Sequence, residues 1–244
     1  MEDRPIVTPY KAEESKKKQV ERMFDNIAPK YDLLNRVLSL GIDIWWRRRA
    51  LGYLRTKQPK EILDVATGTA DLAIMIPKML QPLRIVGIDI ANQMLDIGRE
   101  KIIRQGLAQV VELETGDSER LRFADASFDA VTVAFGVRNF EHLEKGLQEM
   151  RRVLKPNGKL VILEFSRPKQ QSFKGLYNFY MKVVAPKAGS LFAGNKDAYS
   201  YLNKSVQAFP EREQFTDLMQ SAGYKNIYFK TLSLGICCIY CGSK

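Results

Sequence analysis

The sequence has few of the residues from which disulfides and metal sites are built. Its three cysteines are crowded at Cys237, Cys238 and Cys241, and the one histidine, His142, lies far away in the sequence. This composition predicts neither a disulfide framework nor a zinc site, so no bound metal is expected. We expect the cysteines to lie in a core strand, where they act as small apolar residues.

Long apolar runs are also missing. No run approaches the roughly 18 residues that a membrane-spanning helix needs, and the polar start MEDRPIVTPYKAEESKKK is not a signal peptide. These absences predict a cytoplasmic location. The 244 residues, of which 45% are hydrophobic and 27% charged, suit one globular domain with appended segments.

The formal charge of +10 is distributed unevenly along the chain. Residues 1–60 carry 14 basic and 8 acidic side chains, residues 61–166 carry 13 and 16, and residues 167–244 carry 11 and 4. A mildly acidic middle between basic flanks favours a catalytic core whose flanks meet an anionic partner, either nucleic acid or a membrane surface. An ordinary solvated surface is the alternative that the charges leave open.

From residue 60 onward, strand-like and helix-like segments alternate. Strands are predicted at 61–66, 84–88, 109–115, 128–134 and 158–165, and helices at 71–80, 92–105 and 142–154. This alternation predicts an α/β fold, a doubly wound and mostly parallel sheet covered on both faces. A last helix with a C-cap glycine at Gly223 leads to strands near 226–232 and 236–242.

The flanks of this pattern divide the chain further. We treat residues 1–244 as a single domain that consists of a helical cap at 1–58, a cofactor-binding core at 59–166, a helical insertion on the substrate side at 167–208, and the last helix and strand pair at 209–244. The cap reads as two or three amphipathic helices.

The stretch EILDVATGTADLAIMI at 61–76 places a loop of small residues between a buried strand and a helix. Such a loop lets a ligand approach the backbone near the positive end of the helix. A tight turn without a ligand explains this stretch equally well.

Polar residues follow the other strands at the edge where doubly wound sheets bind ligands. Asp89 ends the second strand 21 positions after Gly68, the pair Asp117-Ser118 ends the third, and FGVRN at 135–139 ends the fourth. An acid after the second strand accepts the hydroxyls of a ribose, and the loop lacks the three glycines of a dinucleotide site. A nucleoside without phosphates fits better and indicates S-adenosylmethionine, although each acid alone could cap a helix.

Two longer stretches resemble the signatures of a known family. YDLLNRVLSLGIDIWWR at 31–47 and RVLKPNGKLVILEFSRP at 152–168 are similar to those of the quinone-biosynthesis C-methyltransferase family, as are FGVRN at 135–139 and GDSERLRF at 116–123. Its members methylate demethylmenaquinone and, in some organisms, a ubiquinone precursor. The resemblance implies a class I S-adenosylmethionine-dependent methyltransferase with a seven-stranded sheet and a prenylated quinol substrate.

The resemblance also implies cofactor contacts by Thr69, Asp89, Asp117 and Ser118, in addition to Gly68 of the small-residue loop. Three positions depart from the family pattern, which has histidine near Asp43, glycine at Ala70 and serine or similar at Ala134. Asp43 excludes histidine chemistry at that position. A left-handed alanine at position 70 would cost on the order of 1 kcal/mol.

For methyl transfer to a quinol ring, the catalytic candidates are Arg138 and Asn139. A fixed Arg138 cation stabilises a phenolate, and Asn139 orients a ring oxygen. The structural alternative pairs Arg138 with a carboxylate and makes Asn139 a helix cap. Tyr31 and Asp32 are candidates for the acceptor wall, with an N-cap as the other reading of Asp32.

A prenylated quinol resides in the bilayer, so we expect transient contact with the membrane surface, at the inner face of the plasma membrane. The basic, aromatic-rich cluster around Phe173, Tyr177, Phe179, Tyr180, Lys174, Lys182 and Lys187 is the predicted contact. The competing functions are methylation of another small aromatic or of RNA, and a non-catalytic scaffold. We expect no nucleic-acid partner, and monomer and homo-oligomer both stay open.

Overall fold

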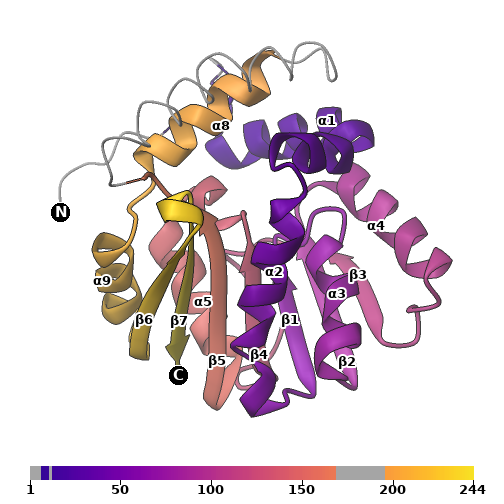
Figure 1. Cartoon of the computed structure of the whole chain (residues 1–244), viewed down its shortest axis with the longest axis vertical. Coiled ribbons are helices and arrows are strands. Elements are labelled where there is room, and N and C mark those ends of the chain that lie inside the picture. The colour runs from indigo at the N-terminus through magenta and orange to yellow at the C-terminus, as the bar shows by residue number, and fades with distance from the viewer. Residues whose placement is uncertain (1–6, 11–12, 169–195) are drawn as a thin grey trace.

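A seven-stranded sheet forms the centre of the computed structural model, which describes residues 7–10, 13–168 and 196–244 (Figure 1). The elements follow one another in the order α1 (Lys16–Leu38), α2 (Ile42–Gly52), η1 (Arg55–Lys57), β1 (Glu61–Val65), α3 (Asp71–Leu80), β2 (Arg84–Asp89), α4 (Asn92–Arg104), β3 (Val111–Thr115), β4 (Phe128–Ala134), η2 (Val137–Asn139), α5 (Leu143–Val153), β5 (Leu154–Phe165), α8 (Lys196–Ala208), α9 (Glu213–Ser221), β6 (Lys225–Leu232), η4 (Ser233–Gly235) and β7 (Cys237–Ser243).

The strand order β3-β2-β1-β4-β5-β7-β6 is that of a doubly wound sheet. The first five strands are parallel, and β7 runs antiparallel to both β5 and β6. The winding reverses between β1 and β4, and the crevice outside the carboxyl ends of the strands at such a reversal is where these folds bind ligands.

The sheet is buried on both faces, which explains the continuous apolar strands. Along β5, Val161 and Leu163 pack with residues of α2, α3 and α4, whereas Leu160 and Ile162 pack with residues of α5 and α9. Successive side chains of a strand point to opposite faces. All four of these side chains are at most 2% exposed, so both helical layers are essential parts of the core.

Most of the predicted elements are confirmed. The three cysteines are free and buried in β7, as expected for a core strand. Gly223, with φ of +90°, follows the end of α9. The fifth strand begins earlier than predicted, at Leu154 rather than 158, because Leu154 already pairs with Phe128 across an irregular register.

The N-terminal cap covers the carboxyl edge of the sheet. Figure 1 shows α1 lying across this edge, with α8 beside it and α2 running down one face. The hydroxyl of Ser15 caps α1 by accepting a hydrogen bond from the Lys18 N–H. Of the predicted insertion at 167–208, α8 is described, whereas the basic and aromatic cluster at 173–187 lies outside the described residues. None of the described helices has the length and apolar content to cross a membrane.

Candidate functional site

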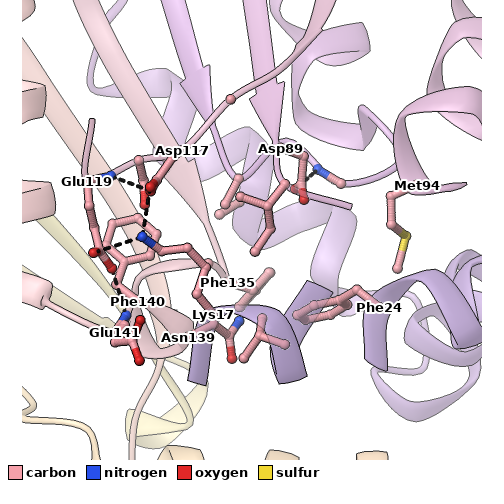
Figure 2. A pocket seen from close by; sticks show the side chains of 18 of the residues that line it. Lys17, Phe24, Asp89, Met94, Asp117, Glu119, Phe135, Asn139, Phe140 and Glu141 are labelled. Carbon is pink, nitrogen blue, oxygen red and sulfur yellow. Dashed lines mark hydrogen bonds and ion pairs between the residues drawn. The ribbon is translucent and has the colours of Figure 1, made fainter. Parts of the chain in front are cut away.

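A cleft opens at the carboxyl ends of β1, β2, β3 and β4, and α1 forms its outer wall (Figure 2). Its empty volume, including the open mouth, is about 680 Å³, which is typical of sites for small molecules. The cleft is lined by segments far apart in the sequence, which contribute Lys17, Val20, Phe24, Tyr31, Ala66, Gly68, Asp89, Ile90, Met94, Gly116, Asp117, Ser118, Glu119, Ala134, Phe135, Gly136, Asn139, Phe140 and Glu141.

Asp89 ends β2 and holds the loop after β1. Its Oδ2 accepts a hydrogen bond from the Gly68 N–H at 2.8 Å, and its Oδ1 accepts one from the Ala91 N–H at 2.9 Å. Burial raises the pKa of Asp89. Each carboxylate oxygen has a further lone pair, so Asp89 can accept ribose hydroxyls while it anchors the loop.

The loop after β1 has left-handed backbone at two alanines as well as at its glycine. The φ angles are +53° at Ala66, +56° at Gly68 and +62° at Ala70. A left-handed alanine costs roughly 1 kcal/mol, so the cost anticipated for Ala70 is incurred twice in this loop. Strain of this kind persists only where the surroundings enforce it, and the hydrogen bond from the Gly68 N–H to Asp89 is one such constraint.

The same loop leaves no room for a side chain at Gly136 on the opposite side. A Cβ at this position would lie 2.5 Å from Ala66 Cβ and 3.1 Å from Val133 Cγ1. Gly136→Ala is therefore expected to lower the free energy of unfolding by about 1–3 kcal/mol. The added Ala66→Gly substitution removes the closer contact and suits the positive φ, so urea unfolding of the double variant should recover most of the loss. A double variant no more stable than Gly136→Ala would contradict this explanation, and Ala66→Gly alone is the control.

Asp64 near the end of β1 holds the loop through a hydrogen bond from Thr67. This residue was not identified from the sequence. It is 1% exposed in β1, and its carboxylate accepts hydrogen bonds from Thr67 Oγ1 and Thr132 Oγ1, both at 2.6 Å. Burial raises its pKa to about 6. The signal that could have found it is an acid at an interior position of the apolar strand sequence EILDV.

Lys17 connects α1 to the end of β3, which the sequence did not predict. Its Nζ donates to Asp117 Oδ2 at 2.7 Å and to Glu119 Oε2 at 3.1 Å, and Figure 2 shows it between the two carboxylates. Glu119 Oε1 also accepts from the N–H groups of Glu141 and His142, ahead of α5. The predicted pair Asp117 and Ser118 thus faces the cleft beside a cation from α1.

Thr69 belongs to the loop after β1, but it is not among the residues that line the cleft. It is 2% exposed, and its hydroxyl donates to Asp32 Oδ1 at 2.5 Å, close to Lys101, which forms an ion pair with Asp32 at 2.8 Å. The hydroxyl of Thr69 thus holds α1, and the cofactor contact expected of Thr69 stays a prediction. The N-cap alternative for Asp32 is wrong, since Asp32 lies inside α1.

Asp43 joins the first two helices. It is 3% exposed and accepts hydrogen bonds from Ser39 Oγ at 2.7 Å, from Arg36 Nη1 at 2.5 Å and from Arg47. Arg36 also pairs with Asp71 of α3 at 2.7 Å. The acid at this position therefore fixes the corner between α1 and α2 through paired charges.

Arg138 forms a buried ion pair. Its Nη1 lies 2.7 Å from Glu164 Oε1, its guanidinium lies 5.4 Å from the centre of the Phe165 ring, and it also donates to the Phe135 carbonyl. Its side chain is 7% exposed and that of Glu164 is fully buried. The structure therefore contains the carboxylate pairing that the sequence left open, and Arg138 is not among the residues that line the cleft.

Asn139 lines the cleft, and its Oδ1 is buried without a hydrogen-bond partner among the described residues. It does not cap the next helix, because α5 begins at Leu143 after His142. Three other buried polar atoms in the described part also lack hydrogen-bond partners: Arg138 Nε, Arg167 Nε and the hydroxyl of Tyr201 on α8. Tyr201 is 2% exposed and packs with Val20 of α1, and no sequence pattern indicated its place beside the cap.

The chain is similar in sequence to proteins of one family. The model of the ubiE/COQ5 methyltransferase family matches residues 12–244. The demethylmenaquinone methyltransferase of Bacteroides fragilis is 46% identical over 98% of this chain and 97% of its own length. The ubiquinone/menaquinone biosynthesis C-methyltransferase UbiE of Geotalea uraniireducens is 44% identical over 94% of this chain and 97% of its own length.

Solved structures support the fold. A SAM-dependent methyltransferase from Thermotoga maritima superposes with a TM-score of 0.64, covers 91% of this chain and 99% of its own, and shares 18% sequence identity. At this identity the match establishes the class I methyltransferase fold, and it carries no information about the acceptor.

Proposed function

Because the chain belongs to the ubiE/COQ5 methyltransferase family, we propose that it is a demethylmenaquinone methyltransferase. It transfers a methyl group from S-adenosylmethionine to a ring carbon of reduced demethylmenaquinone, which gives menaquinol, the last step of menaquinone biosynthesis. The observation that carries this assignment is the 46% identity to a relative of that name across nearly the full length of both chains.

The cleft suits S-adenosylmethionine by its donors and acceptors. Asp89 accepts the ribose hydroxyls, Gly68 brings the backbone close to the ligand, and Asp117 with Ser118 meets the adenine edge. All four line the same cleft, which supports this arrangement. Gly68 suits close approach because no atom lies within 4 Å of the position its Cβ would take. The cofactor supplies a methyl group on a sulfonium sulfur and leaves as a neutral thioether.

The acceptor chemistry needs an electron-rich ring held in line with the methyl group. Loss of a phenolic proton enriches the neighbouring ring carbon. A carbon–carbon bond then forms as the sulfur–methyl bond breaks, and the ring proton leaves to a base or water. In this proposal the unpartnered Oδ1 of Asn139 accepts a hydrogen bond from a ring hydroxyl. Arg138 supplies a fixed positive charge to the phenolate from behind the cleft wall.

Other acceptors are less well supported. The relatives named above act on quinone precursors by their names, and this does not favour methylation of RNA. A ubiquinone precursor differs from demethylmenaquinone in its ring, so substrate competition decides between them.

The tail of the substrate determines where the enzyme works. A prenylated quinol stays in the bilayer, so we propose that the enzyme works from the cytoplasm and contacts the inner face of the plasma membrane transiently. The net charges of +6 over residues 1–60 and +7 over residues 167–244 favour attraction to anionic lipids.

The direct test is transfer of labelled methyl from S-adenosylmethionine to reduced demethylmenaquinone. We expect label in the quinol fraction, and none with the oxidised quinone, because the oxidised ring is not a nucleophile. A reduced ubiquinone precursor and bulk RNA serve as competing acceptors. Label in RNA, or no label in the quinol while the cofactor binds, would overturn the assignment.

A further inference from the structure

The corner between α1 and α2 presents a concentration of exposed apolar side chains. Leu33, Val37, Leu40, Ile42 and Trp45 are 56%, 41%, 85%, 43% and 49% exposed. In the described part of the chain, four other large apolar residues are exposed, and they lie singly elsewhere in the sequence. We call residues 33–45 the elbow.

The spacing of these residues gives the elbow one apolar surface on each helix. Leu33 and Val37 are four residues apart in α1, and Ile42 and Trp45 are three apart in α2, so each pair lies on one helix face. Leu40, the most exposed of the five, lies in the turn with φ of +51°. Exposed apolar side chains that are concentrated in one segment in this way mark a site of interaction.

The elbow is held in shape from inside. Asp43 accepts hydrogen bonds from Arg36 of α1, Ser39 of the turn and Arg47 of α2. Three parts of the corner thus meet at one buried carboxylate. An apolar tip with this support inserts into a partner without first becoming ordered.

The exposed charges of this region have one sign. Between residues 29 and 50 the exposed charged residues are Lys30, Arg48 and Arg49. Asp32 is paired with Lys101, and Asp43 is buried with its arginines. The guanidinium of Arg49 lies 6.0 Å from the centre of the Trp45 ring. An apolar tip with a tryptophan and a basic rim is the composition of a segment that lies in the interface of an anionic bilayer.

The elbow also lies next to the cleft. Tyr31 lines the cleft and precedes Leu33 by two residues on the same helix. Figure 1 shows α1 across the carboxyl edge of the sheet and α2 descending from its end. A bilayer that meets the elbow therefore contacts the helix that also contributes Tyr31 to the lining of the cleft.

We propose that the elbow is the membrane-docking surface of this protein: Leu40 and Trp45 enter the interface of an anionic bilayer while the basic rim binds headgroup phosphates. The proposal rests on the proposed function, since it explains how the cleft reaches a substrate held in lipid. A second copy of the chain is the less favoured partner for the elbow. A two-fold contact through this surface would bring together the basic rims of both copies, with no exposed acid of the elbow to pair with them.

The test is sedimentation of the full-length protein with vesicles of phosphatidylglycerol and phosphatidylcholine, and with phosphatidylcholine alone. We expect binding to the anionic vesicles, and at least about tenfold weaker binding for Leu40→Glu, because a charge then replaces a leucine that enters the bilayer interface on binding. Leu83→Glu, at a residue 69% exposed before β2, is the matched control and should bind as the wild type does. Neutralising Arg48 and Arg49 should weaken binding by about fivefold for each charge.

Tryptophan fluorescence locates the contact. Trp45 is half exposed, whereas Trp46 is 4% exposed and donates to Ser233 Oγ at 2.8 Å. Vesicles should shift the emission of the wild type to shorter wavelength. The shift should vanish in Trp45→Phe, which should still sediment.

Three results would overturn the proposal: no binding of the wild type to anionic vesicles, equal binding of Leu40→Glu and Leu83→Glu, or a dimer that Leu40→Glu dissociates. Methyl transfer to a short-tailed, water-soluble quinol needs no membrane. Measuring it therefore distinguishes a failure of the docking surface from a failure of the proposed reaction. Leu40→Glu should retain this activity. Vesicle binding without any methyl transfer would leave the docking surface intact and remove the assigned reaction.

Discussion

Replacing Asp89 with alanine is expected to weaken binding of S-adenosylmethionine by at least about 100-fold. Hydrogen bonds to a charged group contribute roughly 1.5–3 kcal/mol each, and every 1.4 kcal/mol is a factor of ten in affinity. In the proposed site, two ribose hydroxyls donate to this carboxylate. The substitution also removes the acceptor at 2.8 Å from the Gly68 N–H, so the loop loses its anchor as well. Isothermal titration calorimetry measures the change directly.

The control for this prediction is Asp96→Ala. Asp96 lies on α4 and pairs with Arg99 at the surface, with 61% of its side chain exposed, so its loss removes a carboxylate without touching the cleft. We expect its cofactor affinity to match that of the wild type. A loss of less than about fivefold for a folded Asp89→Ala variant would place the ribose elsewhere.

Replacing Arg138 with methionine is expected to have the largest effect on stability. Glu164 is fully buried, and this substitution leaves its carboxylate without its cation. Breaking a buried ion pair on one side costs about 3–5 kcal/mol, which corresponds to a melting temperature lower by roughly 10 °C for a chain of this size. Thermal and urea unfolding of the variant measure the loss.

This instability should depend on pH in a known direction. Burial raises the pKa of Glu164, and Arg138 lowers it. Without Arg138, the carboxyl group is protonated in the folded state at a pH where the unfolded chain is ionised. When the pKa is higher in the folded than in the unfolded state, the folded protein binds more protons. Its stability then falls as the pH rises above the pKa of the unfolded chain. Arg138→Met should therefore lose more stability at pH 8 than at pH 5.5, and an equal loss would contradict a buried, unpaired carboxylate.

The double variant Arg138→Met with Glu164→Gln separates structure from catalysis. Because neither side chain is then charged, we expect stability close to that of the wild type. If the Arg138 charge acts on the phenolate, kcat should stay low in this stable protein while the affinity for S-adenosylmethionine is kept. Recovery of kcat together with stability would show that the pair is structural.

The order of strands and helices could be predicted because it depends on local pattern. A parallel strand buried on both faces must be apolar, and a helix on its surface must be apolar on one side. Asp89 and Asp117 could be placed at one edge because parallel strands bring their carboxyl ends together. The cysteines were predicted in a core strand because they act as small apolar residues, and the structure places them in β7.

The sequence by itself therefore determined the sheet, its ligand-binding edge and the family. Only the tertiary structure decided which polar groups pair with one another. Lys17 and Asp117 are 100 residues apart in the sequence and form an ion pair. The hydrogen-bonded pair Thr69 and Asp32 is 37 residues apart, and the ion pair of Arg138 and Glu164 is 26 apart. Periodicity reports the environment of a residue, whereas the partner of a buried charge depends on how α1, α2 and the strand ends pack in three dimensions.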